Sequence, residues 1–335
     1  MPKNDSKVLR SKSPLQDTFQ RTIDYLRLSI TDRCNLRCIY CMPLKKRKHK
    51  EHLAYEDLLK IVKAAVRLGV RKIRITGGEP LTREGIVSFI EKLSAIDGLE
   101  DISLTTNGIL LDKLAEPLFH AGLSRVNVSL DSLRTDRYSE ITRGGSLSRV
   151  LAGIEKAEQA GLNPIKLNNV PVRGVNEDEI ETFARLTLHT PFHVRFIEFM
   201  PIGSDLWSPL KYVPLYEIRE TVEKTAPLAP VKLRRNGPAR YYTLPNASGV
   251  IGFISALTHH FCDDCNRLRI TCDGRIRPCL FSDTEIDLKP ALKSKNPNLE
   301  IESLLKLAVQ IKPKGHTLSE KSFSIPARPM SEIGG

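Results

Sequence analysis

Residues 25–41, with the sequence YLRLSITDRCNLRCIYC, join a strand-like run to a group of three cysteines. The run at 26–30 predicts a β-strand, and Cys34, Cys38 and Cys41 follow it at a C-x3-C-x2-C spacing. Three thiolates on one short loop can bind one metal centre, and they leave one of its four positions open. This stretch therefore predicts a strand followed by a metal-binding loop that can also take another molecule.

Three other interpretations of these cysteines are a buried core, a disulfide and a zinc site. The polar neighbours Asn35 and Arg37 argue against a core, and the odd total of seven cysteines argues against a disulfide framework. Zinc needs a fourth ligand, which His49 or His52 would have to supply. Soft thiolate ligands favour an iron–sulfur cluster, and zinc stays open as the alternative.

Strand-like and helix-like stretches alternate from residue 25 to about residue 200. The strand-like runs are 26–30, 72–76, 102–106, 126–130, 165–172 and 194–199. Three helical stretches end at a glycine followed by an apolar residue, the pattern of a left-handed C-cap: Gly69, Gly122 and Gly161. Six βα units predict an α/β protein with a partial (β/α)6 TIM-like barrel, and no further unit is recognisable after Met200.

Chemically reactive residues follow most of the predicted strands. They are the cysteine loop, the motifs GGEP at 77–80 and TTNG at 105–108, the residues Ser129 and Asp131, and the motif EFM at 198–200. Ligands bind at the carboxyl ends of parallel strands in βα folds. We therefore expect one shared site at one rim of the barrel.

The composition favours an anionic partner, because the chain of 335 residues carries a formal net charge of +12. The basic run at 45–50 is interpreted as a solvated loop rather than a nucleic-acid patch, because few aromatic residues surround it. No run approaches the ~20 apolar residues of a membrane-spanning helix, and the N-terminal residues lack the apolar region of a signal peptide. We therefore expect a cytoplasmic protein.

A second cysteine group lies at 262–279. Cys262 and Cys265 form a C-x2-C pair, Cys279 follows, and Cys272 lies between them. Four cysteines at such spacings are typical of a zinc ribbon. Strand-like alternation in 268–272 instead predicts that Cys272 faces the core, which leaves three cysteines for a second open centre. Arginines at 267, 269, 275 and 277 favour an anion site nearby.

The first cysteine loop, with Tyr40 before its last cysteine, and the GGEP motif resemble the radical S-adenosylmethionine (SAM) superfamily. The resemblance extends to the GTP 3′,8-cyclase family, whose members open molybdenum cofactor biosynthesis. The matching motifs lie at 26–34, 74–80, 105–108, 127–131, 195–200, 261–269 and 334–335. The similarity covers nearly the whole chain from about residue 24.

The resemblance implies a lyase that converts GTP to (8S)-3′,8-cyclo-7,8-dihydroguanosine 5′-triphosphate. A 5′-deoxyadenosyl radical would remove hydrogen from C3′ of the ribose, and C3′ would then attack C8 of the guanine. The implied cofactors are SAM and two [4Fe–4S] clusters. One cluster would be held by Cys34, Cys38 and Cys41, and the other by Cys262, Cys265 and Cys279.

The resemblance also implies which residues contact the small molecules. Five residues match SAM contacts: Tyr40, Gly78, Glu79, Ser129 and Met200. Seven match GTP contacts, and arginine forks suit phosphate oxygens: Arg27, Arg74, Thr105, Lys166, Arg195, Arg267 and Arg269. The tail glycines Gly334 and Gly335 would reach into the active site, where only residues without side chains fit.

We expect three regions: a flexible segment at 1–23, the radical SAM barrel at 24–240, and a C-terminal region at 241–335 with the second cluster and the tail. The expected partners are GTP, a one-electron reductant and, functionally, cyclic pyranopterin monophosphate synthase. A homodimer is expected, without membrane or nucleic acid. Two alternatives stay open: a radical SAM enzyme with an auxiliary cluster that modifies a peptide, and a zinc-stabilised nucleic-acid-binding protein.

Overall fold

The computed structural model describes residues 14–42, 48–203, 206–233, 237–316, 318 and 326–334. Six strands pair in chain order, each parallel to the next. They are β1 (Tyr25–Ser29), β2 (Lys72–Thr76), β3 (Asp101–Thr106), β4 (Arg125–Ser129), β5 (Lys166–Asn169) and β6 (His193–Ile197). The predicted partial (β/α)6 barrel is confirmed.

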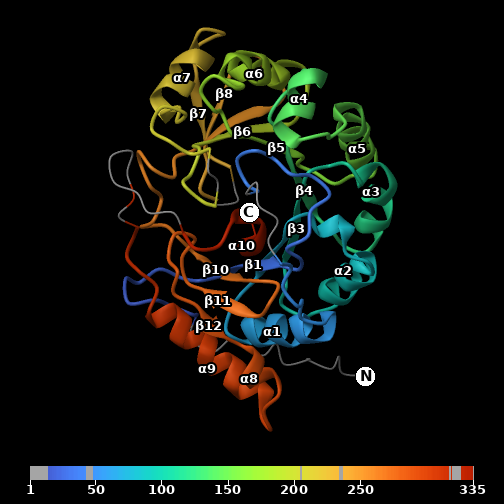
Figure 1. Ribbon diagram of the computed structural model, residues 1–335, viewed down its shortest axis with the longest axis vertical. Coiled ribbons are helices and arrows are strands. Elements are labelled where there is room, and N and C mark those ends of the chain that lie inside the picture. The colour runs from blue at the N-terminus through green and yellow to red at the C-terminus, as the bar shows by residue number, and fades with distance from the viewer. Residues whose placement is uncertain are drawn as a thin grey trace, which may run out of the picture.

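Helices cover the outer face of this curved sheet (Figure 1). They are α1 (Tyr55–Arg67), α2 (Ile86–Ser94), α3 (Leu111–His120), α4 (Thr135–Thr142), α5 (Leu147–Gln159), α6 (Ile180–His189) and α7 (Leu215–Glu223), with 3-10 turns η1 (Pro80–Thr82) and η2 (Glu177–Glu179). The three predicted glycine caps are confirmed, because Gly69, Gly122 and Gly161 have φ of 101°, 98° and 87°.

The sheet continues beyond the six predicted units at both ends. β9 (Val250–Ile254) pairs parallel to β6, and β10 (Arg267–Ile270) pairs parallel to β1. Short antiparallel strands complete the two edges: β7 (Ala229–Val231), β8 (Arg240–Thr243), β11 (Arg275–Arg277) and β12 (Ile286–Asp287). Because β12 and β7 are the edges of the described sheet, the barrel stays open.

Alternation along the strands separates two environments. Leu26 and Leu28 of β1 and Ile73 of β2 are buried in the core beneath the helices. Arg27 and Arg74, which alternate with them, face the interior of the barrel and line a pocket there. The sheet therefore carries an apolar outer face and a cationic inner face.

The fifth strand is shorter than its predicted range of 165–172. β5 ends at Asn169, because Val170 donates its backbone N–H to Asp131 instead of to a neighbouring strand. Pro171 follows and has no N–H for the ladder. The chain thus leaves the sheet at the rim where the reactive residues gather.

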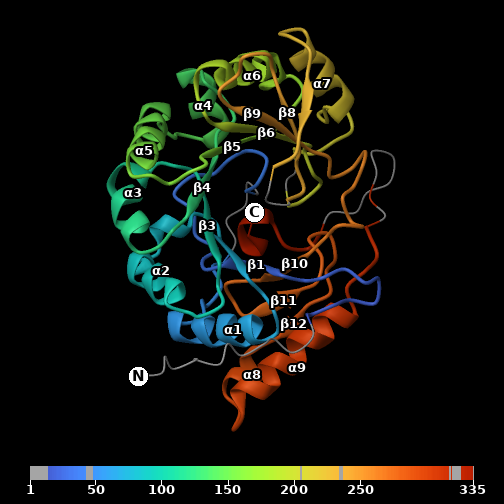
Figure 2. The same cartoon turned by 180° about the vertical axis from the view of Figure 1, so that it is seen from behind.

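The C-terminal helices lie in two different places. α8 (Lys289–Leu292) and α9 (Pro297–Gln310) lie outside the sheet, where α9 packs against α1. α10 (Met330–Ile333) lies inside the ring of strands, and both views agree on this (Figure 1, Figure 2). The end of the described chain therefore reaches the barrel interior.

Candidate active site

The first cysteine loop leaves β1 at the carboxyl rim of the sheet. The backbone N–H groups of Cys41 and Met42 both donate to the carbonyl of Cys38, which curls the loop into a turn. The Sγ atom of Cys34 accepts from the backbone N–H of Leu36 at 3.4 Å and from Nδ2 of Asn107 at 3.9 Å. Burial raises the pKa of the Cys34 thiol to about 12. Metal binding, which favours thiolates, would offset this cost.

The GGEP motif packs directly against the start of this loop. Gly78 donates its N–H to the carbonyl of Thr31 at 2.7 Å, and Glu79 donates to that of Arg33 at 2.8 Å. A Cβ atom on Gly78 would lie 2.3 Å from the carbonyl oxygen of Arg33, and one on Gly77 would lie 2.5 Å from that of Thr31. Both positions need glycine because two backbones meet there.

Glu79 is a buried carboxylate that connects neighbouring segments of the rim by hydrogen bonds. It accepts from the backbone N–H of Leu81 and Asn107, at 3.0 and 2.6 Å, and from the hydroxyl of Thr106 at 2.8 Å. Burial raises the pKa of Glu79 to about 7. These bonds join the motif after β2 to the end of β3, and the predicted contact of Glu79 with SAM stays a prediction.

Tyr40 ties the cysteine loop to the other side of the rim. Its hydroxyl donates to Asp131 at 2.5 Å, and Asp131 also accepts from the N–H of Val170 at 2.9 Å. Burial raises the pKa of Asp131 to about 6. The loop is therefore held from β2, β3 and β4 together.

These residues line a common cavity, which we call the cysteine pocket. Its lining includes seven residues predicted for the first cluster and SAM: Cys34, Cys38, Cys41, Tyr40, Gly78, Ser129 and Met200. Three thiols beside a cradle of glycine backbone match the donor set that a [4Fe–4S] cluster with one open iron requires. The residues present therefore fit this cofactor.

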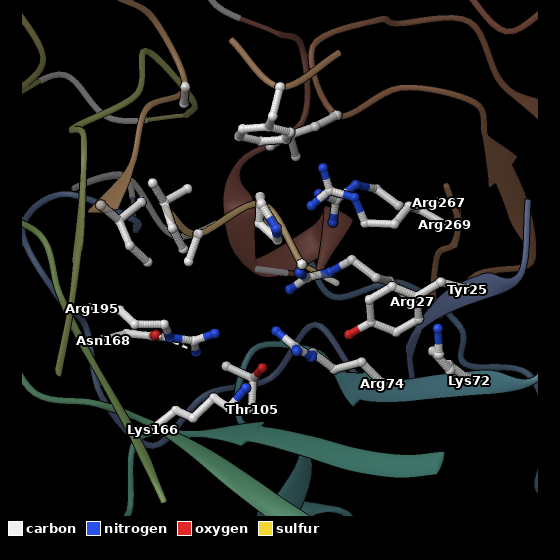
Figure 3. A pocket seen from close by; sticks show the side chains of 18 of the residues that line it. Tyr25, Arg27, Lys72, Arg74, Thr105, Lys166, Asn168, Arg195, Arg267 and Arg269 are labelled. Atoms are coloured by element: carbon white, nitrogen blue, oxygen red, sulfur yellow. Dashed lines mark hydrogen bonds between the residues drawn. The ribbon is translucent and has the colours of Figure 1, made fainter. Parts of the chain in front are cut away.

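A second cavity, the arginine pocket, lies inside the barrel (Figure 3). All seven residues predicted for GTP line it: Arg27, Arg74, Thr105, Lys166, Arg195, Arg267 and Arg269. The labelled side chains in Figure 3 point inward from several sides of the barrel. The structure thus brings together residues from several strands and from both halves of the chain.

Strand register aligns three of these arginines. Arg27 on β1 lies opposite Arg74 on β2 and opposite Arg269 on β10. Burial, and then repulsion from Arg269 and Arg74, lowers the pKa of Arg27 well below its usual range. Burial, and then the charge of Arg267, lowers the pKa of Arg269 to about 9. Like charges held side by side away from water favour an anionic ligand.

The opposite wall of the arginine pocket comes from β5 and β6. Arg195 donates to the side-chain oxygens of Asn127 at 2.7 Å and Asn168 at 2.5 Å, which fixes its direction. Burial, and then the charge of Arg195, lowers the pKa of Lys166 to about 6. Thr105 lies between the walls, and its buried hydroxyl has no hydrogen-bond partner within the described part of the chain.

The charge of the pocket is strongly one-sided. Eight arginine and lysine side chains line it, against one carboxylate from Asp101 among the described lining residues. Asp101 is itself paired with Arg125. Seven of the eight are cationic at neutral pH, and Lys166 gains its charge only near or below pH 6. The eight are Arg27, Lys72, Arg74, Arg125, Lys166, Arg195, Arg267 and Arg269. An anion with several charges, such as a triphosphate, would neutralise this excess.

The second cysteine group lies beside the arginine pocket. Cys262 and Cys279 act on one another electrostatically, as do Cys262 and Cys265. Although burial works to raise it, the charges of Arg267 and Lys312 lower the pKa of Cys265 to about 6. Nη2 of Arg267 lies 3.8 Å from Sγ of Cys265 and so connects the cysteines to the pocket lining.

Cys272 is fully buried, as the alternation predicted. Burial, and then the charges of Asp32 and Asp273, raises the pKa of the Cys272 thiol to about 12, whereas Cys265 responds to Arg267 and Lys312. Cys272 therefore lies in a different environment from the second cysteine group.

The C-terminal tail enters between the two pockets. Met330 lines both of them, and Ser331 lines the cysteine pocket. The carbonyl oxygen of Gly334 accepts from Nη1 of Arg269 at 3.0 Å. A Cβ atom on Gly334 would lie 2.3 Å from Oγ1 of Thr76. Gly335, the other predicted tail residue, lies outside the described residues, as do residues 45–47 of the basic run.

Several lining residues were not predicted from the sequence. They include Asn168 and Tyr241, which line the arginine pocket. Asn168 follows Lys166 by two positions on β5, so strand alternation would have placed it on the same face. Tyr241 lies on β8, in the irregular region for which no repeated pattern existed.

Two family models match the chain. One describes the radical SAM superfamily and matches residues 28–187, and the other describes molybdenum cofactor synthesis C and matches residues 192–318. Together they cover strands β2 to β12 and the end of β1. None of the helices in the described ranges has the length and apolar character needed to cross a bilayer.

Curated relatives match over almost their whole length. The GTP 3′,8-cyclase of Thermodesulfovibrio yellowstonii is 51% identical over 326 residues, covering 96% of this chain and 100% of the relative. The GTP 3′,8-cyclase of Pelotomaculum thermopropionicum is 50% identical over 327 residues, with the same coverage.

Solved structures share the fold. Streptococcus suis SuiB bound to S-adenosylmethionine superposes with a TM-score of 0.61 at 17% identity, covering 86% of this chain and 68% of SuiB. Histidine-tagged anSMEcpe with bound AdoMet gives a TM-score of 0.54 at 16% identity, with coverage of 84% and 80%.

Proposed function

This chain belongs to the GTP 3′,8-cyclase family of the radical SAM superfamily, and from this premise we propose the reaction that it catalyses. The enzyme converts GTP to (8S)-3′,8-cyclo-7,8-dihydroguanosine 5′-triphosphate, the first step of molybdenum cofactor biosynthesis. Membership of the superfamily implies SAM and a [4Fe–4S] cluster as cofactors. The curated relatives and the molybdenum cofactor synthesis C match favour the cyclase over a peptide-modifying radical SAM enzyme and over a zinc-stabilised nucleic-acid-binding protein.

One observation supports this function most directly: the cysteine pocket and the arginine pocket adjoin inside the barrel. They share five lining residues, Thr105, Asn168, Ile197, Met200 and Met330. A thiol-lined cavity suits the radical source, and a cation-lined cavity suits a nucleoside triphosphate. Their common wall would hold the two reacting molecules next to each other, which a hydrogen transfer between them requires.

Cys34, Cys38 and Cys41 would hold the first cluster. When bound, SAM and the reduced cluster would supply the radical chemistry for removing hydrogen from C3′ of the ribose. The protein itself orients SAM and GTP and shields the radical. Tyr40 fixes the loop through Asp131, and the glycine backbone at 77–78 leaves room for the methionine end of SAM.

The triphosphate would be bound by the inner arginines. Arg27, Arg74 and Arg269 lie in register on three neighbouring strands, so that their guanidinium groups can reach neighbouring phosphate oxygens. Arg195 approaches from the opposite wall with its direction set by Asn168. Burial strengthens these charge interactions, because little water screens them.

Cys262, Cys265 and Cys279 would hold a second [4Fe–4S] cluster, whose open iron would bind the guanine. Arg267 supports this assignment, because it lines the arginine pocket and also approaches Cys265 at 3.8 Å. Arg21 braces the group, since it donates to the carbonyls of Cys262 and Pro313 at 2.6 and 2.7 Å. We further propose a one-electron reductant, a homodimer, a cytoplasmic location and coupling to cyclic pyranopterin monophosphate synthase.

Anaerobic reconstitution tests the function. The protein is loaded with iron and sulfide, desalted, and incubated with GTP, SAM and dithionite. We expect about eight irons per chain, the content of two cubanes, and 5′-deoxyadenosine formed as GTP is consumed. A reconstituted protein that cleaves SAM but leaves GTP unchanged would contradict the proposal.

Single cysteine variants test the ligand assignment. Cys279→Ala is expected to lower the iron content to about four per chain, because an incomplete site loses its cluster. Cys272→Ala is the matched control and is expected to keep the full iron content. Equal iron loss in both variants would mean that Cys272 is a ligand.

A further inference from the structure

Asp32, His52 and Cys272 bring a carboxylate, an imidazole and a thiol together away from the cysteine and arginine pockets. Their ligand atoms all lie within 4.8 Å of one another. Oδ1 of Asp32 lies 2.8 Å from Nε2 of His52. The three residues come from the turn after β1, the segment before α1 and the turn after β10.

The thiol of Cys272 is the first indication that this group binds a ligand. Cys272 is 0% exposed and, within the described ranges, forms no disulfide. A soft sulfur atom beside an imidazole and a carboxylate is a ligand that zinc prefers. Of the seven cysteines, Cys272 is the one that neither predicted cluster uses.

The histidines around Asp32 are the second indication. Oδ1 of Asp32 also lies 3.2 Å from Nδ1 of His49, so that two imidazoles converge on one carboxylate oxygen. Its other oxygen accepts from the backbone N–H of Lys50 at 2.7 Å, which holds the carboxylate in place. The sequence had offered His49 and His52 as zinc ligands for the first cysteine loop. The structure groups them with Asp32 instead.

We propose that Asp32, His52 and Cys272 form a zinc-binding site. One thiolate, one imidazole and one carboxylate are ligands that zinc takes, and a water molecule can complete the tetrahedron. Burial, and then the charge of Asp32, raises the pKa of the Cys272 thiol to about 12, and a bound zinc ion would stabilise the thiolate instead.

A nearby cation does not take this role. Arg83 interacts electrostatically with Cys272. Its guanidinium group, however, donates to the carbonyls of Ile30 and Leu53, at 2.6 Å each, and lies 4.1 Å from the centre of the Tyr55 ring. These contacts hold the guanidinium and leave the thiol to another partner.

The site would join two parts of the chain that flank the active site. Leu53 already donates its backbone N–H to the carbonyl of Cys272 at 2.8 Å. Zinc would add a second link between the segment that returns from the first cysteine loop and the end of β10. Because β10 carries Arg267 and Arg269, the link would connect the cysteine loop to the nucleotide-binding wall.

The test uses the reconstituted holoenzyme, so that the iron clusters occupy the other cysteines. The protein is given one equivalent of Zn²⁺ and desalted, and zinc and iron are measured in the same sample. We expect one zinc per chain. The zinc absorption edge is specific to this element, and its fine structure should give one sulfur at about 2.3 Å and nitrogen or oxygen neighbours at about 2.0–2.1 Å.

Variants identify the ligands. Cys272→Ala should remove the sulfur signal, and His52→Gln should weaken zinc retention about 100-fold or more against a competing chelator, beyond the usual effect of outer residues. The matched control His120→Gln removes an exposed histidine outside the group and should retain zinc as the unsubstituted protein does. Unchanged zinc binding in Cys272→Ala, four sulfur neighbours, or no zinc retained by the unsubstituted holoenzyme would each overturn the proposal.

This inference is separable from the proposed function. Iron content and GTP turnover are followed in the same samples. If the holoenzyme consumes GTP but retains no zinc, the zinc site is rejected and the cyclase stands. If it retains zinc and its full iron content but leaves GTP unchanged, the cyclase is rejected and the zinc site stands.

Discussion

The guanidinium group of Arg328 donates to both carboxylate oxygens of Asp273, with Nη1–Oδ1 at 3.0 Å and Nη2–Oδ2 at 2.9 Å. Arg328 also contacts Glu285, with Nε–Oε1 at 2.8 Å. Asp273 and Glu285 flank the β11 hairpin, whereas Arg328 comes two residues before α10. This bidentate pair therefore anchors the tail where it enters the barrel.

Arg328→Ala should release the tail. We expect kcat to fall about 10-fold, equivalent to about 1.4 kcal/mol, because Met330 and Gly334 would no longer be held at the pockets. Hydrogen exchange at 330–334 should rise in parallel. Arg185→Ala, which removes an exposed pair with Glu181 on α6, is the control and should leave both measurements unchanged. Unaltered exchange in Arg328→Ala would argue against an anchoring role.

Gly334→Ala should impair turnover by steric contact. The new Cβ atom would lie 2.3 Å from Oγ1 of Thr76 and 3.0 Å from Cβ of Ser29, so the tail would have to withdraw. We expect turnover to fall at least about 10-fold, again about 1.4 kcal/mol in barrier height, with little change in melting temperature. Gly144→Ala is matched, because Gly144 also has positive φ but nothing within 4 Å of the added Cβ. Equal effects of the two substitutions would point to backbone strain instead.

Thr105→Val should weaken GTP or SAM binding without weakening the fold. The Thr105 hydroxyl is buried without a partner in the described chain, so its removal leaves no protein group unsatisfied. We expect KM to rise up to about 10-fold, the effect of one hydrogen bond. In Thr187→Val the lost hydroxyl donates to the carbonyl of Ala184 at 2.7 Å, and the free energy of unfolding should fall by about 1 kcal/mol with KM unchanged. A destabilised Thr105→Val protein with normal KM would contradict this interpretation.

GTP binding should take up a proton at Lys166. Burial and the charge of Arg195 lower the pKa of Lys166 to about 6, so at pH 7.5 its amine is mostly neutral in the free protein. A bound triphosphate would raise this pKa, and affinity should therefore fall as pH rises above 6, by up to about tenfold per pH unit. Calorimetry in two buffers of different ionisation enthalpy measures the proton.

Lys166→Arg provides the control for this proton, because arginine stays charged throughout the range. The titration of GTP itself is common to both proteins and cancels in the comparison. The variant should bind GTP without the additional proton uptake. Identical proton uptake in the two proteins would assign the proton to another group.

The regular part of the molecule was predictable because its sequence repeats a local pattern. The strand at 72–76 and the glycine caps follow from alternation and from the left-handed conformation that glycine favours. The gathering of the cysteine loop, the GGEP motif and Ser129 around one pocket follows from the rule that parallel strands end at the same rim.

Two features could not be found in this way. β9 and β10 join the sheet by pairing with β6 and β1, and no local signal states which distant strand is a neighbour. The grouping of Cys272 with Asp32 and His52 depends on the same long-range pairing. Cys272 was correctly expected in the core, but a hydrophobic alternation pattern does not reveal which polar groups meet it.

The pairing of β1 with β10 also has a consequence for folding order. Arg27 and Arg269 lie in register but come from opposite ends of the chain, and contacts between distant segments form slowly. The cationic wall can therefore arise only after the chain has folded over nearly its whole length. A nucleotide that neutralises this wall would stabilise the finished sheet and none of its partly folded precursors, so we expect GTP to act as a late folding ligand as well as a substrate.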